Sequence, residues 1–283
     1  MTAPSRHPSH RCQLLHEDAE LAEAIPAARR QRAADELIVH TISLPPGHWS
    51  GERSDPTDGI GLLVTQGLLV RSVGIGEVHG AELLGAGDLL RPWQGEDVAP
   101  TLLQTTAWRV LEPTTMAVLD RRFVSRLVNY PALMEQLVGR ALARSRNLAA
   151  NMAIVHQARV DVRLHMLLWH LADRWGYVRA DGVVLPLHIT HAVLADLVAA
   201  RRPTVTRALS ELTERGLVAP IAKGWLLRGE PPGELAEITP ADPLHVLSGA
   251  RGDGDELQSS PMSSARCRSK RSLCARSAGS SRS

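Results

Sequence analysis

Residues 189–218 of the chain read ITHAVLADLVAARRPTVTRALSELTERGLV, and this stretch decides the interpretation of the fold. It holds two apolar stripes at helical spacing, the first formed by Val193, Leu194, Leu197 and Val198 and the second by Val205, Ala208, Leu209 and Leu212. Small and basic residues separate the two stripes. Because residues three and four apart share one face of a helix, the pattern predicts two short helices joined by a tight turn, which is a helix-turn-helix.

The sequence also marks the ends of the second helix. Pro203 fits its first turn, where a missing N–H breaks no bond within the helix, and Gly216 fits the position after its last turn. Beyond that glycine, residues 217–218 and 225–227 are predicted to pair as a two-stranded wing, with Lys223 near the turn.

The face of the second helix opposite its apolar stripe is polar and suits a DNA groove. Arginine can bind guanine through two hydrogen bonds, and threonine or serine can bind a base edge or a phosphate. The candidate DNA-binding residues are Arg201, Arg202, Thr204, Thr206, Arg207, Ser210 and Lys223. Two amphipathic helices and a hairpin also occur in small α+β domains of other function, so the pattern alone leaves DNA binding open.

Length, composition and charge limit the class of protein. The 283 residues suffice for about two domains, and 44 % hydrophobic residues can form buried cores. No segment approaches the roughly 20 apolar residues of a membrane span, and the polar N-terminus lacks a signal-peptide core. We therefore expect a cytoplasmic protein without a membrane partner. The net charge of +2 is too small to indicate, by itself, that the protein binds a polyanion. Residues 201–215, however, carry four arginines against two glutamates, and such local positive charge is what neutralisation of DNA phosphates requires.

The chain divides into five segments. Residues 1–36 are predicted to be an N-terminal arm, disordered to residue 16, followed by short helices that Pro26 interrupts. Residues 37–120 hold short apolar runs separated by glycines, which predict a small antiparallel barrel. Its candidate strands are residues 37–42, 60–64, 68–73, 81–84, 102–110 and 115–119. A connection at 121–157, the helix-turn-helix domain at 158–247 and a disordered Ser- and Arg-rich tail at 248–283 follow.

A long amphipathic helix is predicted from Pro131 to His156. Its apolar and small residues alternate in steps of four and three, the spacing of a coiled-coil seam, at Met134, Val138, Ala141, Ser145, Leu148, Met152 and Val155. Polar residues, namely Arg140, Arg144, Arg146 and Asn147, are expected to keep the other faces solvated. The narrow seam favours pairing with a second copy of the chain; the alternative is a helix that packs only on its own barrel.

Asp161 and Thr190 are predicted to cap the starts of helices, Asp161 at a hinge between the domains. Neither cysteine nor histidine indicates a metal or a cofactor. Cys12, Cys267 and Cys274 lie in terminal segments, and the predicted barrel has only His40, His48 and His79, without a close set of ligands. His165 and His170 fall on different faces of a helix, where we expect partly exposed polar residues.

Residues 189–218 resemble the C-terminal winged helix-turn-helix of the Crp/Fnr family of bacterial transcription regulators. The matching residues are Ile189-Thr190, Leu194-Ala195, Thr204-Val205, Arg207, Leu209, Leu212 and Gly216-Leu217-Val218. The resemblance implies that Arg202 and Arg207 lie where family members read base edges, and that the long helix is the dimer interface. Pro203 replaces a frequent Glu that accepts from cytosine, so the operator is expected to differ, and Ala199 replaces a frequent turn Gly.

The predicted barrel resembles the sensor domain of the same family, a double-stranded β-helix. The resemblance places Gly67 at an inter-strand turn and Gly87-Asp88-Leu89 at the opening of the segment that binds phosphate in cyclic-nucleotide binders. Those members also supply an Arg followed by Ser or Thr and Ala; here Arg91-Pro92-Trp93 follows, and Arg109 precedes Val110. Cyclic AMP is therefore not the expected effector, and Cys12 alone cannot hold the iron–sulfur cluster of Fnr-type members.

These observations predict an α+β protein with an N-terminal antiparallel double-stranded β-helix (a cupin-like barrel), a long dimerisation helix and a C-terminal winged helix-turn-helix. The predicted function is a non-enzymatic, homodimeric transcription regulator that reads a palindromic operator through residues 202–215. Double-stranded DNA and a second copy of the chain are the expected partners, with RNA polymerase and an unidentified small-molecule effector as further candidates. The alternative is a small-molecule-binding or enzymatic barrel with an accessory DNA-binding module.

Overall fold

The computed structural model describes residues 9–51, 59–76, 78–94 and 104–232. These residues belong to one compact unit, Met1–Glu237. The predicted tail at 248–283, residues 233–247 and the cysteines Cys267 and Cys274 lie outside the described residues.

The N-terminal segment forms a strand followed by short helices. β1 (Ser9–Gln13) pairs antiparallel with β2 (Ile38–Leu44), so the prediction of a disordered arm is wrong for residues 9–16, and Cys12 lies in a strand. This pairing joins segments about 30 positions apart and supplies partners for the backbone N–H and C=O groups at the edge of β2. No local sequence pattern predicts the pairing. The helices are α1 (Leu14–Glu17), α2 (Ala19–Glu23) and α3 (Ala27–Glu36); Pro26 precedes α3, as predicted.

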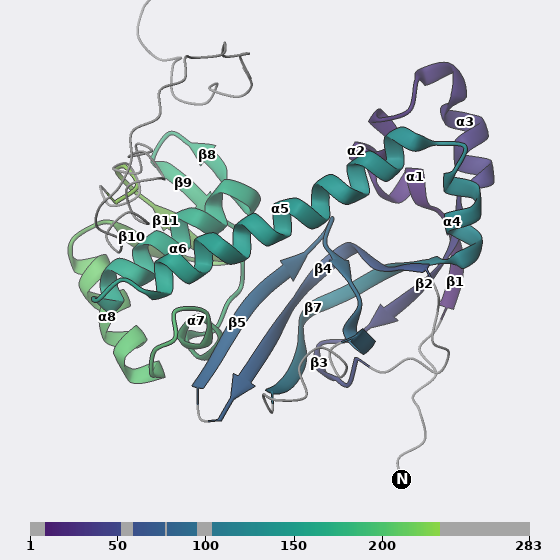
Figure 1. Cartoon of the computed structure of the whole chain (residues 1–283). Coiled ribbons are helices and arrows are strands. Elements are labelled where there is room, and N and C mark those ends of the chain that lie inside the picture. The colour runs from purple at the N-terminus through teal and green to yellow at the C-terminus, as the bar shows by residue number, and fades with distance from the viewer. Residues whose placement is uncertain (1–8, 52–58, 77, 95–103, 233–283) are drawn as a thin grey trace, which may run out of the picture. The chain divides into compact units, whose positions relative to one another are not determined.

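Among the described residues, the predicted barrel region and β1 form a seven-stranded antiparallel sheet (Figure 1). Its order is β1-β2-β7-β4-β5, where the long strands are β4 (Gly59–Ile75), β5 (Val78–Gly85) and β7 (Gln104–Asp120). The short strands β3 (Gly47–Trp49) and β6 (Leu89–Leu90) pair with β7 and β4, and the 3₁₀ turn η1 (Pro92–Gln94) follows β6. β4 and β7 each replace two of the predicted short strands.

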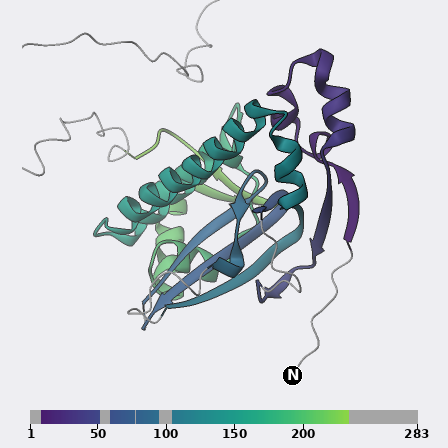
Figure 2. The same ribbon diagram turned by 45° about the vertical axis from the view of Figure 1, so that its right-hand side comes forward.

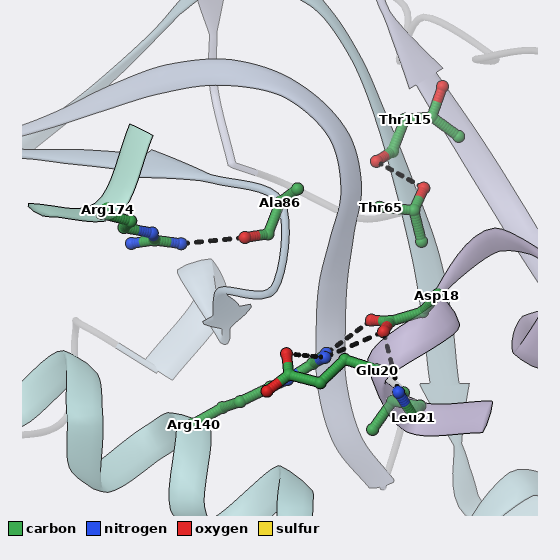
Figure 3. Close-up of polar contacts among 8 residues, drawn as sticks. All are labelled: Asp18, Glu20, Leu21, Thr65, Ala86, Thr115, Arg140 and Arg174. Atoms are coloured by element: carbon green, nitrogen blue, oxygen red, sulfur yellow. Dashed lines mark hydrogen bonds and ion pairs between the residues drawn. The ribbon is translucent and has the colours of Figure 1, made fainter. Parts of the chain in front are cut away.

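Gly67 lies inside β4, so its predicted place at an inter-strand turn is wrong. The register between β4 and β7 shifts from Val64 to Leu69, and Gly67 has a φ of 98° there. A Cβ atom at Gly67 would lie 2.4 Å from the carbonyl oxygen of Pro113. Beside it, the Thr65 hydroxyl donates to the Thr115 carbonyl over 3.1 Å (Figure 3). A bulge with glycine bends a strand without ending it, which is why one strand runs where the sequence predicts two.

α4 (Arg121–Leu127) leads into the predicted long helix, α5 (Pro131–Val155). Figures 1 and 2 show α5 running alongside the sheet from α4 towards α6. Leu133 and Leu137 are buried in a cluster with residues of the N-terminal helices and the sheet. One face of α5 therefore packs on the N-terminal helices and the seven-stranded sheet of the same chain.

Arg140 and Arg144 lie on this packed face, so the prediction that they are solvated is wrong. The Arg140 guanidinium binds Asp18 Oδ2 at 2.5 Å and Glu20 Oε2 at 2.8 Å (Figure 3). Arg144 binds Glu82 Oε1 at 2.5 Å and donates to the Leu89 carbonyl at 2.8 Å. Only 12 % and 19 % of the two side chains are exposed. The sequence does not predict this burial because the partners come from distant parts of the chain.

The C-terminal region has the predicted winged helix-turn-helix. α6 (Val160–Trp175), α7 (His191–Leu197) and α8 (Arg202–Glu214) pack around one core. Among the described residues, β8 (Tyr177–Arg179), β9 (Gly182–Leu185), β10 (Val218–Ile221) and β11 (Gly224–Leu227) form a second sheet in the order β10-β11-β9-β8. The mixed α+β class, with an antiparallel sheet before the helix-turn-helix, is confirmed.

Two predictions for α6 need correction. The residue before the helix is Arg159, and Asp161 is the second helical residue, so Asp161 is not the N-cap; its buried carboxylate binds Arg159 at 2.6 Å and Arg215 at 3.7 Å. His165 is 7 % exposed and not partly exposed, because its Nε2 accepts from the Trp169 indole at 3.1 Å within the core.

Candidate nucleic-acid interface

α7 and the turn after it hold α8 in place. Thr190 caps α7 as predicted, since its hydroxyl accepts from the Val193 N–H over 3.3 Å. Ala199, in the turn, has a φ of 48°, a left-handed conformation that glycine adopts more easily. The Ala200 N–H closes the turn onto the Ala195 carbonyl at 2.9 Å. The chain then re-extends at Arg201, the residue before α8.

α8 separates an apolar face from a polar one. Its buried residues are Val205, Ala208, Leu209 and Leu212, each at most 4 % exposed. These side chains belong to the core that also includes α6 and α7. Of the candidate DNA-binding residues, Arg201, Arg202, Thr204, Thr206, Arg207 and Ser210 are all exposed on α8 or directly before it. Burial of the stripe therefore fixes the polar face outward.

Arg207 has a partner on its own helix. Its Nε donates to Glu211 Oε1 over 2.8 Å, one turn further along, and 83 % of the Arg207 side chain is exposed. Such a solvated i,i+4 pair contributes only about 0.3–0.5 kcal/mol, so a phosphate or a guanine can replace Glu211 at low cost.

The hydroxyl groups of the face bond to the helix backbone. Thr206 Oγ1 donates to the Arg202 carbonyl at 3.1 Å, and Ser210 Oγ donates to the Thr206 carbonyl at 3.2 Å. His191 Nδ1 lies 3.0 Å from Thr206 Oγ1. Both hydroxyl oxygens keep acceptor capacity, but their protons are engaged, so a DNA group would have to donate to them or displace these bonds.

The hairpin of β10 and β11 adds the seventh candidate residue. Ile221 pairs with Gly224, which leaves Ala222 and Lys223 as a two-residue turn with Lys223 exposed. Gly216, with a φ of 70°, ends α8 and redirects the chain into β10. The wing predicted from the sequence is therefore present. The ammonium group of Lys223 is exposed at its turn, where it can approach a phosphate.

Sequence reasoning missed two residues that position this face. Arg163 of α6 donates through Nη1 to the carbonyls of Val198 at 3.2 Å and Ala199 at 3.4 Å, so it binds the turn between α7 and α8. His191 contacts Thr206 and also lies beside the Trp225 ring of β11, with a centroid distance of 6.4 Å. His191 could have been suspected from its place after the Thr190 cap; nothing local indicates Arg163.

Within the described ranges, no group of three His, Cys, Asp or Glu residues is arranged to hold a metal ion. None of the helices in the described part of the chain is both long and apolar enough to span a bilayer.

Comparison with known proteins agrees with this geometry. Residues 162–228 match the family model of the Crp-like helix-turn-helix domain. The chain is 24 % identical over 191 residues to a CRP-like cAMP-activated global transcriptional regulator of Mycobacterium tuberculosis, covering 67 % of this chain and 84 % of that protein. A cyclic nucleotide-binding domain containing protein from Listeria monocytogenes has a similar structure, with a TM-score of 0.57 and 14 % identity over 74 % of this chain and 96 % of its own.

A CooA variant from Carboxydothermus hydrogenoformans is also similar, with a TM-score of 0.51 and 18 % identity over 70 % of this chain and 86 % of its own. These two structures establish the shared fold. Fold, interface and family model together define a DNA-binding transcription regulator. Residues 162–228 form a Crp-like helix-turn-helix domain, and the rest of the chain shares its fold with these solved structures.

Proposed function

We propose that two copies of the chain pair through α5 and read a palindromic operator, each inserting α8 into one major groove. The observation that carries the proposal is the exposed polar face of α8, held outward by the buried stripe and flanked by the Lys223 hairpin. Arg202 and Arg207 would contact base edges, and Arg201, Thr204, Thr206, Ser210 and Lys223 would contact bases or phosphates.

The dimer rests on the second face of α5. Beside the packed face of Leu133 and Leu137, this helix exposes a stripe of apolar and small side chains. Met134, Val138 and Met152 are 38 %, 50 % and 64 % exposed, and Ala141 and Ser145 are also exposed, while Leu148 and Val155 are half-buried. Leu142, outside the predicted seam, is 55 % exposed and widens the stripe. An apolar stripe along a helix that already packs on its other side is typical of a helix–helix interface.

The sequence predicts no response to cyclic AMP. This prediction is supported by the ion pairs that the arginines near Gly87-Asp88 form with carboxylates. The Asp88 carboxylate accepts from the Gly85 N–H at 2.8 Å and binds Arg174 at 2.9 Å. Arg140 and Arg144 are occupied by carboxylates as well. A cyclic phosphate here would have to separate partly buried ion pairs and leave carboxylates unpaired, which is costly. RNA polymerase and a small-molecule effector remain predicted partners.

Selection of bound fragments from random DNA with the purified full-length protein tests the proposal. We expect two inverted half-sites with centres about 34 Å, one helical turn, apart, and no change in affinity on addition of cyclic AMP. Recovery of a single half-site contradicts the dimer, and recovery of no shared sequence contradicts operator reading through α8. A cyclic AMP-dependent gain in affinity contradicts the inferred loss of that response.

A further inference from the structure

A cavity of about 340 Å³ lies between the seven-stranded sheet, the C-terminal half of α5 and α7. Strands β4 and β5, α5, α7 and the turn before α8 all contribute to its walls. Its volume lies at the small end of the range of ligand pockets, so it suits a compact molecule. Most of the wall is hydrocarbon, supplied by Val73, Ala81, Leu148, Met152, Val155 and Leu197.

One cation in this wall, Arg71 of β4, is incompletely paired. Its Nε lies 2.6 Å from Glu82 Oε1 but forms no hydrogen bond, and Nε is buried too deeply for a ligand to reach. The same carboxylate already accepts two hydrogen bonds from Arg144, at 2.5 Å and 3.2 Å. The exposed 30 % of the Arg71 side chain includes the terminal nitrogens Nη1 and Nη2, for which no described residue provides an acceptor. The outer edge of this guanidinium is therefore available to a ligand.

The charges around Arg71 leave one positive charge uncompensated. Two guanidinium groups, those of Arg71 and Arg144, share the single carboxylate of Glu82. Burial lowers the pKa of Arg71 below its ordinary value; the charge of Glu82 opposes this effect, and the like charge of Arg144 adds to it. A negative charge beside the terminal nitrogens of Arg71 would therefore stabilise the buried cation.

A second carboxylate in the wall, that of Asp196 on α7, limits the ligand to one negative charge. The positive charges that act on Asp196 are those of His79 and Arg109. Burial raises the pKa of Asp196, and these two charges only partly oppose the effect, so the site tolerates little further negative charge. A monoanion balances Arg71, whereas a dianion would add an uncompensated charge near Asp196.

The shape of the free edge of Arg71 and the apolar wall define the rest of the ligand. A carboxylate can accept from both terminal nitrogens of a guanidinium at once, through its two oxygens. The remainder of the molecule must be hydrocarbon, because the hydroxyl groups of a sugar phosphate would lose water without gaining partners against the apolar wall.

We propose that this cavity binds a small amphipathic monocarboxylate, with its carboxylate on the terminal nitrogens of Arg71 and its hydrocarbon part against β5, α5 and Leu197. Ala199, the left-handed residue of the turn before α8, lines the same cavity. The ligand contacts the sheet, α5 and this turn at once, so its binding favours the arrangement in which these parts lie together. Its role as a regulator of DNA binding rests on the proposed function, whereas its binding to the cavity does not.

Fluorine NMR titrations of the full-length protein with 4-fluorobenzoate and 4-fluorobenzamide test the site. The two probes have nearly the same shape, but only 4-fluorobenzoate carries a charge. We expect 4-fluorobenzoate to bind at least about tenfold more tightly, the effect of one charge-assisted hydrogen-bonded pair. Acetate, which has the carboxylate without the hydrocarbon part, should not displace 4-fluorobenzoate at equal concentration.

Three variants locate the binding. Arg71→Gln should remove the preference for 4-fluorobenzoate while the fold stays intact, because Glu82 keeps both of its hydrogen bonds from Arg144. Arg121→Gln removes the same charge from an exposed position of α4 outside the cavity wall and should keep the preference. Val73→Trp, which fills the cavity, should abolish binding of 4-fluorobenzoate in a protein whose circular dichroism matches that of the wild type.

Undetectable binding of 4-fluorobenzoate, equal affinities for the two probes, displacement by equimolar acetate, or an unchanged preference in Arg71→Gln overturns the assignment. Loss of the preference in Arg121→Gln, or binding retained in Val73→Trp, also overturns it. These titrations contain no DNA, so failure to find an operator does not affect them. In a separate titration with operator DNA, saturating 4-fluorobenzoate should change the affinity of the wild-type protein at least about twofold, and an unchanged affinity overturns the regulatory role.

Discussion

Arg207 is the residue at which base reading can be tested most directly. Its guanidinium is exposed and held only by a solvated pair with Glu211. Arg207→Ala should weaken binding to the selected operator by roughly 1–3 kcal/mol and relax the base preference at one position of each half-site, because a bidentate contact to guanine is lost. Fluorescence anisotropy with single-base operator variants measures both effects.

The control for this substitution is Arg121→Ala, since Arg121 is an exposed arginine on α4, away from the helix-turn-helix. It removes the same charge and should leave operator affinity within about twofold. If Arg207→Ala weakens binding to every sequence equally, Arg207 contacts only phosphate and the assignment to base reading is wrong.

Ala199 tests the geometry of the turn before α8. A non-glycine residue in the left-handed region is strained by about 1 kcal/mol. The hydrogen bonds of the turn, from the Ala200 N–H to the Ala195 carbonyl and from Arg163 to the Ala199 carbonyl, do not depend on the Ala199 side chain. Ala199→Gly should therefore raise the free energy of unfolding by up to about 1 kcal/mol. Urea denaturation followed by circular dichroism measures the change.

Ala200→Gly is the matched control, one residue further along, where φ is not positive. There glycine relieves no strain, increases the entropy of the unfolded chain and removes a methyl group that packs against the core, so the free energy of unfolding should fall by at least about 0.5–1 kcal/mol. Equal destabilisation by the two substitutions would show that the turn does not have the left-handed conformation.

At the scale of elements, α5 has two faces with different partners. One face packs on the N-terminal helices and the sheet through Leu133, Leu137, Arg140 and Arg144, and the other exposes the seam with Val138 and Met152. The sequence alternatives, a helix that packs on its own barrel or one that pairs with a second copy, therefore do not exclude each other. Both faces are present on the same helix because about one third of its circumference suffices for each.

Val138→Glu tests the seam. Pairing of two copies would bury the introduced carboxylates against apolar side chains, so the dimer dissociation constant should rise at least about tenfold, or about 1.4 kcal/mol. Analytical ultracentrifugation measures it. Ala153→Glu places the same charge at an exposed position of α5 outside the seam and should leave the dissociation constant unchanged. Identical behaviour of the two variants, or a monomeric wild-type protein, contradicts pairing through this face.

At the scale of the whole molecule, Arg174 of α6 connects the helix-turn-helix region to the seven-stranded sheet. Its Nη2 lies 2.9 Å from Asp88 Oδ2 and 2.9 Å from the Ala86 carbonyl (Figure 3), and the Asp88 side chain is only 6 % exposed. The contact joins residues 86 positions apart. It places α6 against the turn between β5 and β6.

Arg174→Met should lower the free energy of unfolding by about 3 kcal/mol, because it leaves the buried Asp88 carboxylate without its cation. Denaturant titration measures the loss, and Asp88→Asn in the same background should restore much of it. Arg179→Met, which removes an ion pair exposed by 50 % and 45 %, should cost under about 1 kcal/mol. A similar loss in both variants would contradict the structural role of the Arg174 contact.

The position of the candidate site could largely be predicted because it depends on short, local sequence patterns. The stripe from Val205 to Leu212 sets the polar face of α8, Pro203 and Gly216 set its limits, and Thr190 caps α7; each signal spans a few residues. The positioning roles of His191 and Arg163 were not predicted from the sequence. Their partners, Thr206 and the carbonyls of the turn, lie 15 and about 35 positions away. The role of such a side chain depends on which element packs beside it in the folded protein.

The sequence by itself determined the class of fold, the helix-turn-helix and the position of α5, since the periodicity of apolar residues fixes which face of a helix or strand is buried. Only the tertiary structure decided that β1 joins the sheet, that Gly67 bends one strand instead of ending it, and that Arg140 is paired and not solvated. Arg140 and Asp18 are 122 positions apart, and no local pattern specifies a contact that depends on how separate elements pack together.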